Sequence, residues 1–375
     1  MSFGPIVNER TAPSAQGAPT DTSVSFVAGL VTTGATDEAV PVASVADFEA
    51  EFGPRQGAVV ALYDWLDVSF REGLALAYIG GYSATGEYDA GLDLFDSRLG
   101  PGQVTVVGET NAAAVYQSVQ THVDANNRIG LLDVDDGDDI AAITTHGDNA
   151  GALPNMENVG VFGSWATCAG PPGVAGSGGR KVPASAVIAG LCSRVDQSGN
   201  PNRAAGGYDF PLQYVDGFEL DPNDVDRASC FQHGVNMFAN RFGVLENYGF
   251  QTPVQQSPNT PFWQLNCSRT RMWLKARAQA IGERYYMRPI DGQGKLAGRL
   301  GSELEAMCAD LYEVDGLYGA TKVDAYNVNT SVSLNTTATA AQAVLKAVVE
   351  ARLSQYAKSV QIDLVSVPVS GVVSQ

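Results

Sequence analysis

The chain has 375 residues, enough for two or three domains, and its 41 acidic and 23 basic side chains leave a formal charge of −18. This charge argues against a broad contact with nucleic acid phosphates, and 45% hydrophobic residues are typical of a globular protein. No apolar run reaches the length of a membrane span, and the first 20 residues lack the features of a signal peptide. Five widely spaced cysteines include no C-x-x-C pair, so we expect neither a zinc site nor a disulfide framework.

The N-terminal residues 1–21 are rich in Ala, Pro, Ser, Thr and Gly. Their only sizeable apolar side chains are Phe3, Ile6 and Val7, which are too few to form a core. The composition by itself favours a disordered tail, and we interpret the segment as an N-terminal arm.

The next segment, residues 22–84, has the pattern of an α/β unit. A helix is expected over Val45–Phe52, with Ser44 as its N-cap and Gly53 after its end. The other expected elements are strands at Thr22–Val31 and Ala75–Tyr82, an extended piece at Glu38–Ser44 and a helix at Gly57–Glu72.

Residues 85–255 alternate between strand and helix patterns, which predicts a mostly parallel sheet covered on both faces. The expected strands are Gln103–Val107, Arg128–Asp133 and Val159–Ser164. The expected helices are Tyr88–Leu99, Asn111–Ala125, one that starts in Asp138–His146, and Ala184–Val195.

The last part of the chain is expected to contain long helices and then strands. Helices are predicted within Phe262–Arg288 and at Leu296–Leu311, and a strand at Val323–Asn329. Ala343–Leu353 fits both a strand and a helix, so periodicity alone does not decide between them. Ser359–Val369 alternates as a strand whose apolar residues are Val360, Ile362, Leu364 and Val367.

Several stretches, in order along the chain, are similar to contractile tail sheath proteins of bacteriophages and related injection machines. The most specific are Thr22–Leu30, Thr36–Gly53 and Phe70–Gly73, where turn, cap and aromatic spacing all agree. The helix after Lys181 also resembles the family, through Ser185, Ala189-Gly190, Arg194 and Asp196. The chain departs from the family with VPAS in place of VPPS, with Tyr248 in place of Trp and with Gln251 in place of Arg.

The resemblance implies a mixed α/β fold with a mostly parallel sheet flanked by helices, α/β N- and C-terminal regions, and extended terminal arms. It divides the chain into an arm at 1–21, an N-terminal segment at 22–84, a middle domain of subtilisin-like fold at 85–255, a C-terminal domain at 256–356 and an arm at 357–375. It also favours a strand over a helix for Ala343–Leu353.

The same resemblance implies a structural subunit without catalytic residues, metal or cofactor. Such subunits form homo-hexameric rings that stack helically around an inner tail tube, contact baseplate and tail terminator proteins, and contract by rearrangement. Neighbouring subunits exchange strands, here expected for the arm with Phe3, Ile6 and Val7 and for the strand with Val360, Ile362, Leu364 and Val367. The implied location is a virion tail assembled in the bacterial host cytoplasm, with no direct contact to nucleic acid and no membrane insertion.

Two other classes remain open, a serine hydrolase of subtilisin-like fold and a non-contractile virion structural protein. Asp133, His146 and Ser185 follow the residue order of subtilisins, yet the serine motif of those enzymes is missing. We therefore expect no hydrolase activity.

Two charged stretches could bind an ion or a partner. The acidic stretch LLDVDDGDDI faintly resembles a calcium loop but lacks its terminal Glu, so we expect a solvated loop whose acids cap the next helix. Arg269, Arg271, Lys275 and Arg277 concentrate positive charge in an acidic chain. They are either a solvated helix face with internal partners or a contact with an acidic inner tube.

Overall fold

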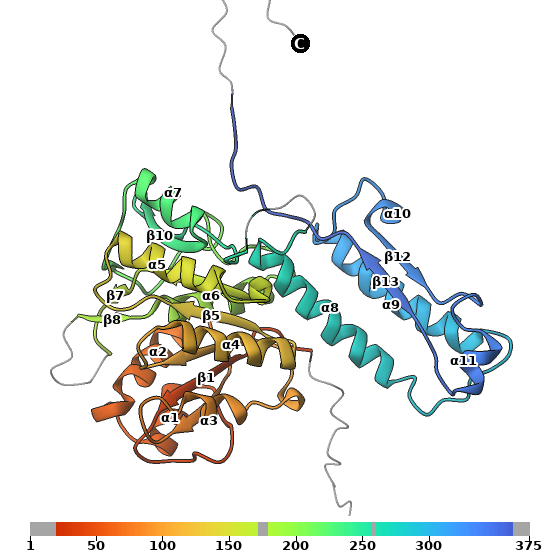
Figure 1. The fold of residues 1–375 in the computed structure, drawn as a ribbon, viewed down its shortest axis with the longest axis horizontal. Helices are drawn as coiled ribbons and strands as arrows, with labels where there is room; N and C mark the ends of the chain where they lie inside the picture. Colours follow the sequence, from red (N-terminus) through yellow and green to blue (C-terminus); the bar gives the residue numbers. More distant parts are fainter. Residues whose placement is uncertain (1–19, 172–178, 255, 257–259, 363–375) are drawn as a thin grey trace, which may run out of the picture.

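The structure is a computed structural model that describes residues 20–171, 179–254, 256 and 260–362. A large α/β body is built on one eight-stranded sheet, and a smaller body follows it in the chain (Figure 1). The long helix α8 (Leu265–Glu283) links the two bodies, because its first half lies in the core of the large body and its second half in that of the small one.

Six neighbouring strands of the large sheet run parallel, and one antiparallel strand closes each edge. The spatial order is β11-β10-β6-β5-β4-β1-β3-β2. This confirms the predicted mixed, mostly parallel sheet. The strands are β1 (Ser25–Leu30), β2 (Val40–Val42), β3 (Ala77–Tyr82), β4 (Gln103–Val107), β5 (Ile129–Asp133), β6 (Val159–Gly163), β10 (Val235–Arg241) and β11 (Val244–Asn247).

Helices cover both faces of this sheet, as the buried runs of the parallel strands require. Successive residues of β1 belong to different cores, since Val27 packs in one and Phe26 and Ala28 in the other. The helices of the large body are α1 (Val45–Phe52), α2 (Val60–Arg71), α3 (Tyr88–Asp93), α4 (Ala113–Asn126), α5 (Ile140–Gly151), α6 (Ala184–Gln197) and α7 (Asp224–Gln232). Short 3₁₀ turns lie at Gly57–Val59, Ser97–Leu99 and Met156–Asn158.

The first two expected segments, 22–84 and 85–255, share this one sheet. Strand β1 pairs with β3 on one side and with β4 on the other, so the boundary expected near residue 84 cuts across the sheet. Local patterns could not reveal this, because the order of strands depends on crossovers between distant parts of the chain.

Local signals located α1 correctly. The Ser44 side chain accepts a hydrogen bond from the Asp47 amide, and Gly53 ends the helix at a φ of 87°. The expected helix at Tyr88–Leu99 is shorter, because α3 ends at Asp93 and only a 3₁₀ turn follows. A small three-stranded sheet, not foreseen from the sequence, comprises β7 (Ala166–Cys168), β8 (Arg180–Val182) and β9 (Gly217–Phe218).

The small body has its own apolar core between α8, α9 and an antiparallel pair of strands. Its elements after α8 are α9 (Lys295–Glu313), α10 (Lys322–Ala325), β12 (Tyr326–Asn329), α11 (Thr337–Ala341) and β13 (Val348–Ala351). The preference for a strand in Ala343–Leu353 is confirmed for β13. The strand expected from Val323 is wrong in its first half, which forms α10 with Thr321 as its N-cap.

Helices α2 and α6 approach closely at Gly190, and this contact gives a first prediction. A Cβ at residue 190 would lie 2.4 Å from the Cβ of Glu72 and 2.8 Å from the Ser69 carbonyl oxygen. Because backbone cannot easily move away, Gly190→Ala is expected to lower the free energy of unfolding by about 1–3 kcal/mol in urea denaturation.

The matched control is Gly298→Ala on the exposed face of α9, where the added Cβ meets nothing within 4 Å. That substitution is expected to stabilise the chain by roughly 0.5–1 kcal/mol, as alanine does in helices. A Gly190→Ala variant as stable as the wild type would contradict the close helix contact.

Candidate functional site

Ser185, the serine of the candidate triad, is completely buried at the start of α6. Its amide donates to Asp133 Oδ1 at 2.7 Å and its hydroxyl donates to Asp133 Oδ2 at 2.5 Å. The indole of Trp65 donates to the same hydroxyl oxygen at 2.9 Å. The hydroxyl is therefore part of a closed hydrogen-bond network and is not presented to solvent.

His146, the candidate base, belongs to a different cluster. Its Nδ1 lies 2.9 Å from the hydroxyl of Tyr116, and its Nε2 lies 3.1 Å from Asp138 Oδ2. In a catalytic triad the imidazole lies between the serine and the carboxylate, whereas here Ser185 bonds Asp133 directly. The three residues do not form a triad in this structure.

The buried Asp133 carboxylate leads to a prediction on pH. Loss of water on burial raises its pKa to about 7, although the two hydrogen bonds from Ser185 favour the charged form. In the unfolded chain an Asp has a pKa of about 3.9. Between about pH 3.9 and about pH 7, the Asp133 carboxyl group is therefore protonated mainly in the folded state. Stability from this group is therefore lost as the pH rises toward about 7.

For the wild type, Asp133 should make the folded state roughly 2 kcal/mol more stable at about pH 5.5 than at about pH 8. The Asp133→Asn variant should lack this part of the pH dependence, as measured by urea denaturation at both pH values. Asp310→Asn, at an exposed position of α9, serves as the control, and its free energy of unfolding should change with pH as that of the wild type does. If the free energy of unfolding changed equally with pH in all three proteins, the pKa of Asp133 would be the same in the folded and unfolded states.

The other residues of the family-like stretch connect α6 with its neighbours. Arg194 reaches the buried carboxylate of Glu72 at 3.4 Å, and Glu72 also accepts the amides of Gln213 and Tyr214 at 2.9 and 2.6 Å. Burial raises the pKa of Glu72, and these hydrogen bonds and Arg194 oppose that shift. The stretch that carries the resemblance thus positions helices of the large body.

The basic residues of α8 do not form one exposed face. Arg269 is 1% exposed and binds Asp196 through two 2.9 Å hydrogen bonds, so its assignment to an exposed contact surface is wrong. Burial at this position follows from the packing of α8 against α6, which α8's own sequence does not show. Lys275 and Arg277 are exposed, and the Arg277 guanidinium lies 4.8 Å from the centre of the Trp273 ring.

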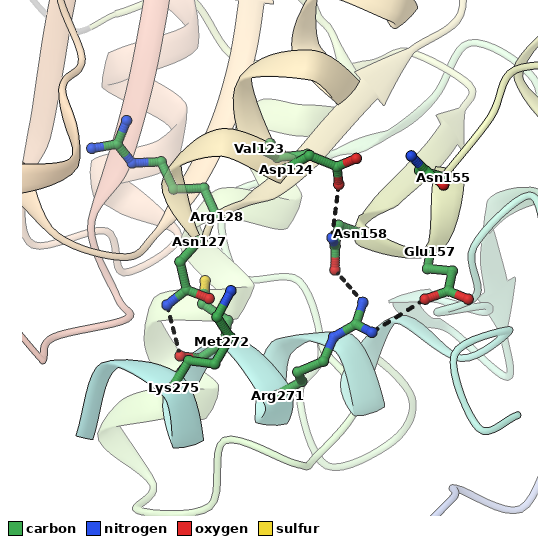
Figure 2. A pocket seen from close by; sticks show the side chains of 10 residues that line it. All are labelled: Val123, Asp124, Asn127, Arg128, Asn155, Glu157, Asn158, Arg271, Met272 and Lys275. Carbon is green, nitrogen blue, oxygen red and sulfur yellow. Dashed lines mark hydrogen bonds and ion pairs between the residues drawn. The ribbon is translucent and has the colours of Figure 1, made fainter. Parts of the chain in front are cut away.

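Arg271 lines a polar pocket of about 330 Å³ between α4, α8 and the turn before β6 (Figure 2). Its guanidinium reaches Glu157 Oε2 at 3.2 Å and Asn158 Oδ1 at 2.7 Å, and Asn158 in turn donates to Asp124 at 3.2 Å. Arg271 therefore has an internal acidic partner, Glu157, as expected for a helix face with partners inside the chain.

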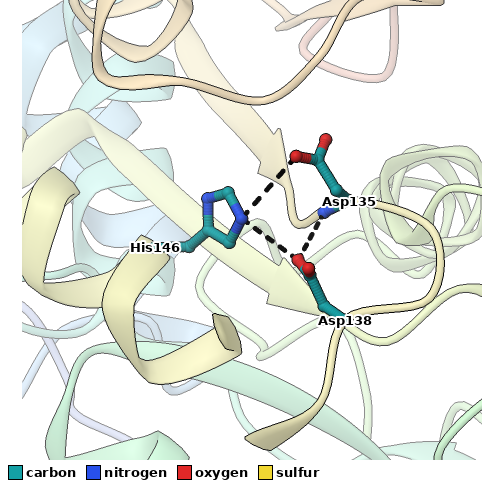
Figure 3. Close-up of side chains that lie close together, drawn as sticks. All are labelled: Asp135, Asp138 and His146. Carbon is teal, nitrogen blue, oxygen red and sulfur yellow. Dashed lines mark hydrogen bonds and ion pairs between the residues drawn. The ribbon is translucent and has the colours of Figure 1, made fainter. Parts of the chain in front are cut away.

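The acidic stretch after β5 is a loop whose last member caps the next helix, as expected. Asp139 accepts a hydrogen bond from the Ala142 amide at the start of α5. Lys181 pairs with Asp136 at 2.8 Å and also with Glu219. Two further acids, Asp135 and Asp138, gather beside His146 (Figure 3). The sequence did not indicate this set, because His146 lies inside helix α5 and the two acids lie in the loop before it.

The predicted arm residues Phe3, Ile6 and Val7, and Leu364 and Val367 of the expected last strand, lie outside the described residues.

The described end of the chain is anchored at Tyr356, whose amide and carbonyl both bond the Gln264 side chain, at 2.9 and 3.0 Å. After it, residues 359–362 belong to no strand, and Val360 and Ile362 are 79% and 83% exposed. The expected strand is thus not formed there within the single chain.

All five cysteines are buried and free of disulfides. Among the helices within residues 20–362 that the structure describes, none combines the length and apolar character needed to cross a membrane.

No protein-family profile matches the chain, and no curated protein matches it in sequence. Solved structures are nevertheless similar along nearly its whole length. A chain of the anti-feeding prophage baseplate is 16% identical with a TM-score of 0.73, covering 98% of this chain and 99% of that chain. A chain of the PVC sheath complex, an extracellular contractile injection system in the contracted state, is 14% identical with a TM-score of 0.72, covering 97% and 98%.

A third match is the sheath tail protein of Desulfitobacterium hafniense, 10% identical with a TM-score of 0.57, covering 87% of this chain and 93% of that one. The chain therefore has the fold of contractile tail sheath proteins, as the sequence resemblance implied.

Proposed function

We propose that this protein is a structural subunit of a contractile tail sheath. The observation that carries the proposal is the match along nearly the whole chain, across both bodies, to chains of contractile injection systems, with at least 97% of each chain covered in two of them. A shared single domain would say little about function, since folds are reused widely. A shared arrangement of two bodies and a linking helix is more specific to one kind of assembly.

In the proposed assembly, copies of the chain form hexameric rings stacked helically around an inner tube, with baseplate and tail terminator proteins at the ends. The particle would be a virion tail or a related extracellular injection device, assembled in the bacterial cytoplasm. Contraction would rotate and shift whole subunits, which suits two packed bodies joined by a continuous helix.

The geometry supports a structural role over the hydrolase alternative. The residues that suggested hydrolysis were Asp133, His146 and Ser185, in that order, and the Ser185 hydroxyl is buried and bonded to Asp133. A non-contractile virion protein would share the fold but not the change in lattice.

Electron microscopy of the purified full chain, alone and co-expressed with its tube protein, tests the proposal. We expect tubular assemblies of two diameters, corresponding to extended and contracted lattices. Only one lattice under all conditions, including denaturant or acid shock, would favour the non-contractile alternative. A protein that stays monomeric at high concentration and beside tubes would contradict a sheath function.

For the tube contact, the structure leaves Lys275 and Arg277 as the exposed members of the basic set. We expect the double variant Lys275→Glu/Arg277→Glu to fold normally but to bind acidic tubes more weakly in co-sedimentation. High salt should weaken the wild-type contact in the same way. The control, Arg98→Glu with Arg203→Glu on the large body, changes the charge equally and should still bind tubes.

A further inference from the structure

The loop after β5 and helix α5 bring three metal-ligating side chains together, outside the packing that the proposed function uses (Figure 3). Asp135, Asp138 and His146 each offer one ligand atom, and these atoms all lie within 4.8 Å of one another. All three side chains are partly exposed, so an ion from solvent can reach them.

Hydrogen bonds from outside the cluster determine which nitrogen of His146 faces the two carboxylates. The Tyr116 hydroxyl donates its proton to the Asp133 carbonyl at 2.7 Å, so toward His146 Nδ1, at 2.9 Å, its oxygen acts as the acceptor. Nδ1 therefore carries a proton, and Nε2 is the ring nitrogen that faces the two carboxylates. Nε2 lies 3.1 Å from Asp138 Oδ2 and 3.9 Å from Asp135 Oδ2.

The two carboxylates are also held in place, one by Asn111 from outside the cluster and the other by the backbone of the loop. Asn111 donates its amide and its side-chain nitrogen to Asp135 Oδ1, at 2.7 and 3.1 Å, which leaves Oδ2 turned toward His146. The Asp135 amide donates to Asp138 Oδ2 at 2.9 Å. In metal sites, hydrogen bonds of this kind from surrounding groups orient the ligands and fix the tautomer of a ligating histidine.

Two carboxylate oxygens and one imidazole nitrogen thus converge on one point, and the two negative charges repel one another unless a cation lies between them. The neighbouring charge is mostly negative, from Asp136 and Asp139 on the same loop, and Lys181 is occupied by Asp136 and Glu219. A divalent ion offsets both negative charges and uses all three ligand atoms.

We propose that Asp135, Asp138 and His146 bind one first-row divalent cation of the Zn²⁺ type. One imidazole nitrogen with two carboxylate oxygens suits such an ion better than Mg²⁺ or Ca²⁺, which take oxygen ligands alone. Three protein ligands leave a position for water. The bound ion ties loop 134–139 to α5, and this site does not depend on the sheath function.

Isothermal titration of the full chain, carrying no histidine tag, with Zn²⁺ in a non-chelating buffer tests the proposal. We expect one site per chain and a higher melting temperature with Zn²⁺, because the ion binds only the folded state. Asp138→Asn, which is nearly isosteric, and His146→Ala should each weaken binding at least about tenfold. Tyr116→Phe, which removes the partner of Nδ1 together with the hydrogen bond to the Asp133 carbonyl, should weaken it by about tenfold or more.

The matched control is His233→Ala, because His233 also pairs with an aspartate, Asp148 of the same helix α5, at 2.7 Å but on the exposed surface. This variant should bind Zn²⁺ like the wild type. The absence of saturable binding, or equal affinity in wild type and Asp138→Asn, would overturn the proposal even if His146→Ala fails to fold.

Discussion

Replacing Arg269 with methionine is expected to lower the free energy of unfolding by about 3–5 kcal/mol. The substitution leaves the Asp196 carboxylate, which is only 9% exposed, without its cationic partner. Of the polar contacts described for that carboxylate, the Thr22 hydroxyl at 2.8 Å would remain, and one neutral hydrogen bond cannot stabilise a buried charge. Urea denaturation followed by circular dichroism measures the loss.

A double variant distinguishes the loss of stability caused by an unpaired buried charge from the contribution of the ion pair itself to the free energy of unfolding. Arg269→Met with Asp196→Asn removes both charges, and it should recover much of the stability lost by the single variant. Lys322→Met breaks the exposed pair with Glu313 and should leave the unfolding midpoint essentially unchanged. If Arg269→Met were as stable as Lys322→Met, the Arg269 side chain would have to be exposed to solvent in the folded subunit. Arg269 would then again be a candidate for the contact with the tube.

Deleting residues 359–375 is expected to abolish polymerisation while the subunit stays folded. The chain is fastened to the large body up to Lys358, whose ammonium lies 4.5 Å from the centre of the Phe231 ring. Beyond it, Val360 and Ile362 expose their side chains, so their removal costs the single subunit little. We propose that this segment pairs with a neighbouring subunit by adding a strand to its sheet.

The truncated protein should have the wild-type melting temperature and elute as a monomer in size-exclusion chromatography under conditions where the full chain forms tubes. Tyr356→Ala is the matched comparison, because Tyr356 accepts a hydrogen bond from the Phe250 amide and packs against the core. That variant should lose stability by about 2–4 kcal/mol, close to other large-to-small core changes. Tubes formed by the truncated protein would exclude strand exchange through this end.

The other arm is expected to behave in the same way. A deletion that stops at residue 20 keeps the Asp21 carboxylate, which accepts the Ser23 amide at 2.9 Å, and keeps the contact of Thr22 with Asp196. The shortened subunit should therefore fold but fail to link its neighbours. A shortened subunit that unfolds would assign the first 20 residues to its own core instead.

The sequence by itself determined the features that depend on neighbouring residues. The cap of α1 at Ser44, the buried strands β4 and β5 and the helix after Pro183 were all predicted close to their observed bounds. Alternation of strands and helices was enough to predict a mostly parallel sheet. The family resemblance rested on the same short-range spacing and led to the correct overall fold.

Only the tertiary structure decided which of the chemically reactive residues meet. Asp133, His146 and Ser185 have the order of a triad, but Ser185 faces Asp133 while His146 faces Asp138. Arg269 looked like surface charge because its partner Asp196 is 73 residues away. Contacts between residues so far apart in the sequence depend on how helices and crossovers pack. Periodicity shows only on which face of its helix or strand a residue lies, not which distant side chain it meets.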